Sequence, residues 1–117
     1  MSERARILVI DDEPDARRIS IRLLEQAGYA LSEAATGEEG LRRARELRPD
    51  LILLDVVLPD LDGFEVCRRI KADPELAHIL VILLSGKRVD SESVAGGLEG
   101  GANGYILRGT PTHEFLA

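Results

Sequence analysis

The stretch DLILLDVVLPDLDGFEVCRRIK, residues 50–71, joins an apolar run, an acidic residue and the start of a helix. The run Leu51–Leu54 is continuous rather than alternating, which is typical of a parallel strand buried on both faces. Asp55 follows it directly. Asp62 and Glu65 stand three residues apart before further apolar positions, a pattern typical of a helix N-terminus. This segment therefore predicts a strand, a loop and a helix in that order.

Short apolar runs alternate with amphipathic stretches on both sides of this segment. Strong runs occur at Ile7–Ile10 and Ile79–Leu84, and weaker strands are expected at Ala30–Ala34 and Gly104–Leu107. Helices are expected after Pro14, after the Thr36 and Glu39 capping pattern, after Asp62, near Ser91 to Glu99 and from Thr112. This repeated strand–helix order predicts a flavodoxin-like, doubly wound α/β fold: a five-stranded parallel sheet in the order 2-1-3-4-5.

Some of the expected helices carry more specific predictions. The first should bury one stripe of residues, namely Ala16, Ile19, Leu23, Leu24 and Ala27. Cys67, in the third, is expected to be a small core residue rather than a reactive thiol. Glycines at positions 96, 97, 100 and 101 weaken the fourth, so high mobility is expected over residues 88–103. The fifth is expected to be truncated, because the chain offers too few residues after Pro111.

Length and composition limit the function classes. A chain of 117 residues with 44% hydrophobic residues is expected to form one domain over residues 1–117. The net charge of −6 argues against direct nucleic-acid binding, which needs a basic surface. No apolar run approaches the roughly 20 residues of a membrane span, and no secretory signal precedes Ile7. A cytoplasmic protein without membrane contact is therefore expected.

Acidic residues follow two strands that the predicted order makes neighbours. Asp11 and Asp12 follow the first strand and Asp55 follows the third, on either side of the point where ligands bind such sheets. Clustered carboxylates repel one another, and Mg²⁺, which prefers hard oxygen ligands, relieves that repulsion. A carboxylate beside the metal can then act as a nucleophile toward a phosphoryl group. For each acid alone, a solvated loop residue or a helix cap is the alternative.

The sequence resembles the receiver domains of two-component response regulators. The matching segments are ILVIDDEPD at residues 7–15, the opening segment at 50–71, ILVILLSG at 79–86 and GANGYIL at 101–107. The resemblance implies metal binding by Asp11 and Asp12, phosphoryl acceptance by Asp55, metal ligation by the backbone carbonyl of Val57, and switch roles for Ser85 and Tyr105. It also implies Mg²⁺ as cofactor and a histidine kinase or histidine phosphotransfer protein as phosphoryl donor.

The chain departs from the family after the fifth strand, where Arg108 and Gly109 replace the usual Lys-Pro. Arginine and lysine differ in geometry, so Arg108 is expected not to pair directly with Asp55. Lys87, two residues beyond Ser85, is the candidate substitute cation. The short C-terminus suggests the N-terminal part of a longer signalling protein with a C-terminal output domain.

Two functions are weighed at this point. The first is a phosphorylatable switch that catalyses only its own phosphorylation and slow dephosphorylation, and so is not a turnover enzyme. The second is a receiver-like interaction module that is not phosphorylated, because the Arg108 site is defective. A flavin carrier is set aside because the acids of residues 11–15 would repel a flavin phosphate. The partner kinase and the oligomeric state, a homodimer included, are left open.

Overall fold

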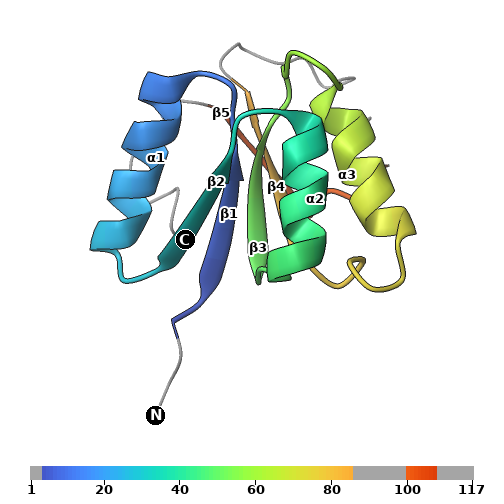
Figure 1. Ribbon diagram of the computed structural model, residues 1–117, viewed down its shortest axis with the longest axis horizontal. Helices are drawn as coiled ribbons and strands as arrows, with labels where there is room; N and C mark the ends of the chain where they lie inside the picture. Colours follow the sequence, from blue (N-terminus) through green and yellow to red (C-terminus); the bar gives the residue numbers. More distant parts are fainter. Residues whose placement is uncertain (1–3, 86–99, 108–117) are drawn as a thin grey trace.

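The computed structural model describes residues 4–85 and 100–107, which form a twisted sheet with helices on both faces (Figure 1). The strands run parallel in the order β2-β1-β3-β4-β5, as the sequence predicted. Their bounds are β1 (Arg6–Ile10), β2 (Ala30–Ala34), β3 (Leu51–Asp55), β4 (Leu80–Ser85) and β5 (Gly104–Leu107). The flavodoxin-like fold is therefore confirmed.

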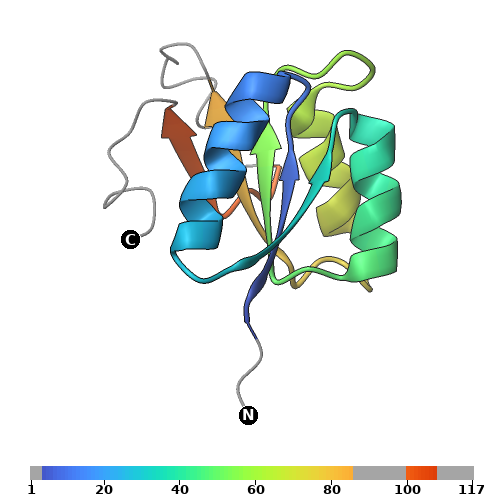
Figure 2. The same ribbon diagram turned by 60° about the vertical axis from the view of Figure 1, so that its left-hand side comes forward.

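Helix α1 (Pro14–Gln26) covers one face of the sheet, while α2 (Gly37–Leu47) and α3 (Gly63–Ala72) cover the other (Figures 1 and 2). The side chains of β1 alternate between the two layers. Ile7 and Val9 pack in the cluster that includes Leu24 of α1. Leu8 and Ile10 pack in the larger cluster that includes residues of α2 and α3. The central strands are thus buried on both faces, which explains their continuous apolar runs.

The helix starts follow the capping chemistry of the sequence. Glu13 caps α1, because its side chain accepts a hydrogen bond from the backbone N–H of Asp15. Thr36 caps α2 by accepting from the N–H of Glu39 at 3.1 Å. The Glu39 carboxylate in turn accepts from the N–H of Ala35 at 2.7 Å, so the return bond of the expected capping box goes to the residue before the N-cap and not to Thr36 itself.

The stripe predicted for α1 is wrong at Ile19, which is 61% exposed, and at Ala27, which also faces solvent. The helix instead buries Ser20 and Leu24, with Ile21 packed beside them. These positions repeat at helical spacing and face the sheet, whereas Ile19 lies on another side of the helix. The sequence reading followed hydrophobicity and therefore overlooked a small buried serine.

Cys67 is a core residue, as expected, with 1% of its surface exposed. Burial raises the pKa of its thiol, although the charge of Lys71 acts in the opposite direction. The expectations for the fourth and fifth helices and for high mobility over residues 88–99 lie outside the described residues, and high mobility at residues 100–103 stays a prediction. Within the described part of the chain, no helix is long and apolar enough to cross a membrane.

Candidate functional site

Three acids from two adjacent strand ends meet at the carboxyl edge of the sheet. Strands β1 and β3 are in register at Ile10 and Leu54, so the residues that follow leave the sheet side by side. One carboxylate oxygen each from Asp11, Asp12 and Asp55 lies within 4.8 Å of the others. Asp11 is 1% exposed and Asp55 is 6% exposed, whereas Asp12 faces solvent. The sequence-predicted acids are therefore brought together.

The donor set fits a magnesium ion. Mg²⁺ binds oxygen ligands at about 2.0–2.1 Å, so two ligands on opposite sides lie roughly 4.2 Å apart. The oxygen spacing in the acid cluster, up to 4.8 Å, is close to that value. The exposed Asp12 leaves one side open to water, which suits an ion that keeps several of its waters.

The two buried acids are held in the same way by their own loops. Asp11 Oδ1 accepts a hydrogen bond from the backbone N–H of Glu13 at 3.0 Å. Asp55 Oδ1 accepts one from the N–H of Val57 at 3.1 Å. Each bond spans two residues and turns the chain sharply away from the strand. Each carboxylate is therefore fixed by local backbone before any ligand binds.

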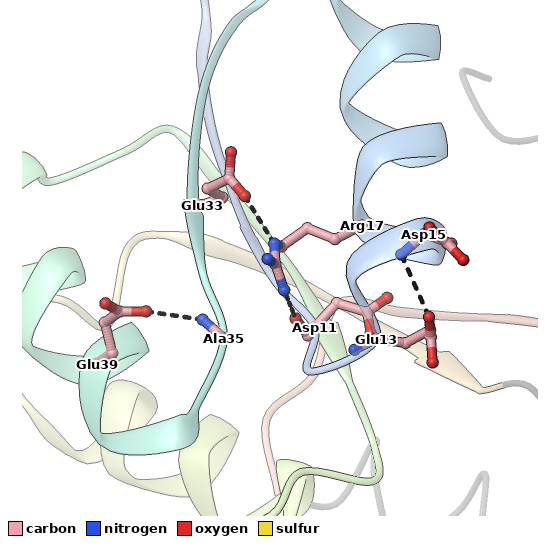
Figure 3. Close-up of polar contacts among 7 residues, drawn as sticks. All are labelled: Asp11, Glu13, Asp15, Arg17, Glu33, Ala35 and Glu39. Atoms are coloured by element: carbon pink, nitrogen blue, oxygen red, sulfur yellow. Dashed lines mark hydrogen bonds and ion pairs between the residues drawn. The ribbon is translucent and has the colours of Figure 1, made fainter.

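Arg17 of α1 also supports this edge, a contact that the sequence reading missed (Figure 3). Its Nη1 donates to the main-chain carbonyl oxygen of Asp11 at 2.7 Å, and its Nε donates to Glu33 Oε1 at 2.7 Å. The bridge ties the end of β1 to β2 and α1. Nothing in the sequence pairs Arg17 with Glu33 of another element or with a main-chain carbonyl.

Gly63, at the start of α3, packs directly against the backbone of Asp55. A Cβ built there would lie 2.3 Å from the Asp55 carbonyl oxygen and 2.7 Å from Val56 Cα, so only glycine fits. Its N–H donates to the carbonyl oxygen of Val56 at 2.8 Å. The loop between β3 and α3 thus closes on itself behind the acid cluster.

Ser85 lies on β4, the strand next to β3, and Tyr105 lies on β5, one strand further out. Ser85 ends β4 with 6% exposure, and β4 pairs its Leu84 with Asp55. Tyr105, in β5, packs against the core on the α3 side, with its ring 6.4 Å from that of Phe64. The hydroxyl predicted for the site therefore stands one residue beyond the strand position that is paired with Asp55.

The remaining predicted site residues are not tested by the structure. Val57 lies in the loop after Asp55 and is 69% exposed, and metal ligation by its backbone carbonyl stays a prediction. Lys87 and Arg108 lie outside the described residues, so the expectation that Arg108 avoids Asp55 stays a prediction.

Comparison with known proteins gives a consistent result. A family model described as the response regulator receiver domain matches residues 7–117. The transcriptional regulatory protein AfsQ1 of Streptomyces coelicolor is 47% identical over 103 residues, which cover 87% of this chain and 44% of that protein. The gliding motility regulatory protein of Myxococcus xanthus is 40% identical over 99% of this chain and 15% of that protein. The chain thus spans less than half of either relative.

The solved structure of the chemotaxis protein CheY4 of Vibrio cholerae has a similar fold. It superposes with a TM-score of 0.90 at 27% identity, covering 97% of this chain and 94% of that one. The match therefore extends over nearly the full length of both chains.

Proposed function

The chain belongs to the response regulator receiver domain family, and from this premise we propose that it is a phosphorelay switch that accepts a phosphoryl group on Asp55. One observation carries the proposal: carboxylate oxygens of Asp11, Asp12 and Asp55 lie within 4.8 Å of one another at the carboxyl edge of the sheet. In a signalling family, such a cluster beside a buried aspartate suits phosphoryl transfer better than a structural role.

The residues have separate tasks in this transfer. An oxygen of Asp55 attacks the phosphorus, a P–O bond forms, and the bond from phosphorus to the donor nitrogen or oxygen breaks with its electron pair. Asp11 and Asp12 hold Mg²⁺, with the backbone carbonyl of Val57 as a further ligand. When bound, the ion neutralises charge on the carboxylates and the phosphoryl oxygens. The bond from Val57 N–H to Asp55 Oδ1 fixes the orientation of the nucleophile.

Ser85 and Tyr105 carry the change outward in this proposal. The Ser85 hydroxyl donates a hydrogen bond to a phosphoryl oxygen, and β4 moves with it. Tyr105 lies on the strand that pairs with β4, where its ring packs near Phe64 of α3. A shift of β4 therefore reaches the surface around β4 and β5.

The partners belong to the same proposal. We take the donor to be a histidine kinase or histidine phosphotransfer protein, and the domain to be the N-terminal part of a longer cytoplasmic protein with a C-terminal output domain. The relatives named above are longer than this chain, which supports a further domain. With a net charge of −6, the domain is not expected to bind nucleic acid itself. The domain modifies only itself and turns over no outside substrate.

A phosphate-free interaction module remains the second candidate, favoured by Arg108 and Gly109 at the position of the family's Lys-Pro. Incubation with acetyl phosphate and Mg²⁺, followed by measurement of the intact mass, distinguishes the switch from the interaction module. The switch takes up one acid-stable, base-labile phosphoryl group, and Asp55→Asn takes up none. If wild-type protein takes up no phosphoryl group from either acetyl phosphate or a cognate kinase, the result favours the interaction module.

The metal site has its own test with a matched control. Asp12 and Asp15 are both exposed acids of one segment, but only Asp12 belongs to the acid cluster. Mg²⁺ is expected to raise the melting temperature of wild type and of Asp15→Ala by mass action, and to have a weaker effect on Asp12→Ala. An equal response in all three proteins contradicts the site.

A further inference from the structure

We propose that Asp60 is a positioning residue for phosphoryl acceptance: it fixes the acceptor loop, residues 56–62, against the start of α2. The inference rests on the proposed function of Asp55. Asp60 lies five residues beyond Asp55 and is not one of the acids expected to bind metal. Its partners come from a helix that is more than twenty residues away in the sequence.

The Asp60 carboxylate uses both oxygens on α2. Oδ1 accepts a hydrogen bond from the N–H of Gly37 at 2.8 Å, and Oδ2 accepts one from the N–H of Glu38 at 2.9 Å. Bonds of this kind to an ionised acceptor are stronger than neutral ones, and the helix dipole favours a negative charge at this end. Two bonds from one planar group fix both the position and the orientation of the loop.

These bonds are additional to the local cap of α2. Thr36 already satisfies the N–H of Glu39, and Glu39 returns a bond to the N–H of Ala35. The helix therefore starts correctly without Asp60. What Asp60 adds is a connection between that start and a different loop, the one that leaves Asp55.

Close packing at both ends makes the connection rigid. A Cβ on Gly37 would lie 2.9 Å from Leu61 Cβ and 3.0 Å from Val66 Cγ2, so α2 begins in direct contact with the acceptor loop. At its other end, the loop is closed by Gly63 against the backbone of Asp55. Val57 lies between Asp55, against which Gly63 packs, and Asp60, which is bonded to α2, so the loop leaves Val57 little freedom to move.

The charge of Asp60 is secured by its partners. Desolvation acts to raise its pKa, but hydrogen bonds from the backbone N–H groups of Glu38, Gly37, Asp60 and Leu61 outweigh it, so the pKa of this carboxyl lies below its usual range. The carboxylate is therefore ionised at neutral pH. The connection is present under the conditions in which phosphoryl transfer takes place.

The test compares Asp60→Ala and Asp60→Asn with Thr36→Ala. Thr36→Ala weakens the same helix start but leaves the acceptor loop untouched, so it controls for a loss of helix stability. The Mg²⁺ dissociation constant and the second-order rate of labelling by acetyl phosphate are measured well below the melting temperature of every variant. Wild type serves as the reference for the proposed function.

Misplacement of reacting groups by about 1 Å can cost up to 100-fold in rate. For Asp60→Ala we expect labelling to slow by about tenfold and the Mg²⁺ dissociation constant to rise by about threefold, on that scale of misplacement. Asp60→Asn keeps one acceptor oxygen for α2 and should recover part of both effects. Thr36→Ala should stay within about twofold of wild type at a comparable loss of stability.

The outcomes separate this inference from the proposed function. If wild type and Asp60→Ala are both labelled, and at the same rate, the positioning role is overturned but the proposed function is not. Equal losses in Asp60→Ala and Asp60→Asn also overturn it, because they assign the effect to charge rather than to position. Wild type that takes up no phosphoryl group overturns the proposed function, and the role of Asp60 with it.

Discussion

Arg17 Nη1 donates a hydrogen bond to the main-chain carbonyl oxygen of Asp11 at 2.7 Å (Figure 3). The side chain of Arg17 is 17% exposed, and its Nε is paired with Glu33 at the same time. The carbonyl of the residue directly after β1 thereby accepts from a guanidinium of α1. The contact holds the turn that presents Asp11 and Asp12 without using either carboxylate.

Arg17→Ala should therefore destabilise the protein and weaken Mg²⁺ binding together. We expect a loss of about 1.5–3 kcal/mol in the free energy of unfolding, typical of a hydrogen bond to a charged group. Arg17→Lys should recover little, because one ammonium cannot reproduce both directions of the guanidinium. Urea unfolding and Mg²⁺ titration measure the two effects.

Arg18→Ala is the matched control for that experiment. Arg18 is the next residue of α1 and faces solvent. Its removal should change stability by no more than about 0.5 kcal/mol, as is usual for surface positions. Equal effects at Arg17 and Arg18 would mean that the Asp11 carbonyl bond is unimportant.

Gly63→Ala should damage both the fold and the site. The added methyl group would lie 2.3 Å from the Asp55 carbonyl oxygen, and backbone cannot move aside as a side chain can. We expect a loss of about 1–3 kcal/mol, the usual range for overpacking, together with slower labelling of Asp55. Chemical denaturation and the acetyl phosphate assay measure these.

Gly104→Ala offers a comparison for that substitution. A Cβ there would meet the Cδ1 end of Ile82 at 2.9 Å, a contact that side-chain rotation can relieve. Gly104→Ala should therefore reduce the free energy of unfolding by less than Gly63→Ala does. A larger cost at position 104 would contradict the argument that the Asp55 backbone is what excludes a side chain at Gly63.

The sequence predicted the fold because each local signal agreed with the global one. Continuous apolar runs marked the strands buried on both faces, and Thr36 with Glu39 marked the start of α2. The convergence of Asp11 and Asp55 followed from topology alone, since parallel neighbours end at the same edge. Asp12 needed only its position next to Asp11.

The supporting contacts could not be predicted in the same way. Arg17, Asp60 and Gly63 act through main-chain atoms of distant residues, and a carbonyl or an N–H group has no signature in the sequence. Ile19 failed for a different reason: the predicted stripe grouped it with Leu23, but the buried face of α1 runs through Ser20 and Leu24. Successive helical residues are about 100° apart, so Ile19, one position before Ser20, is turned away from the sheet and is 61% exposed.

Cys67 should react with thiol reagents only when the protein opens. Its thiol is buried on α3, its pKa is raised by that burial, and only the thiolate is nucleophilic. Iodoacetamide at pH 7.5, with intact mass as readout, should leave native protein unmodified and label it rapidly in denaturant. Rapid labelling of native protein would mean that α3 opens easily from the sheet.

The pH dependence of stability should reveal the charge of Asp60. Desolvation acts to raise the pKa of Asp60, but backbone hydrogen bonds outweigh it, so this pKa is lowered in the folded state. The ionised carboxylate therefore contributes stability that is fully present above the pKa of the unfolded chain, about 4. That contribution is lost as the pH falls through the lower folded value. Near pH 7, the free energy of unfolding of Asp60→Asn should therefore be lower than that of wild type by about 0.5 kcal/mol, as for an exposed acid at a helix N-terminus. The free energies of the two proteins should converge toward pH 3. Urea unfolding across this range measures the difference. A gap between the two proteins that stays constant or widens as the pH falls would contradict a contribution from the Asp60 carboxylate.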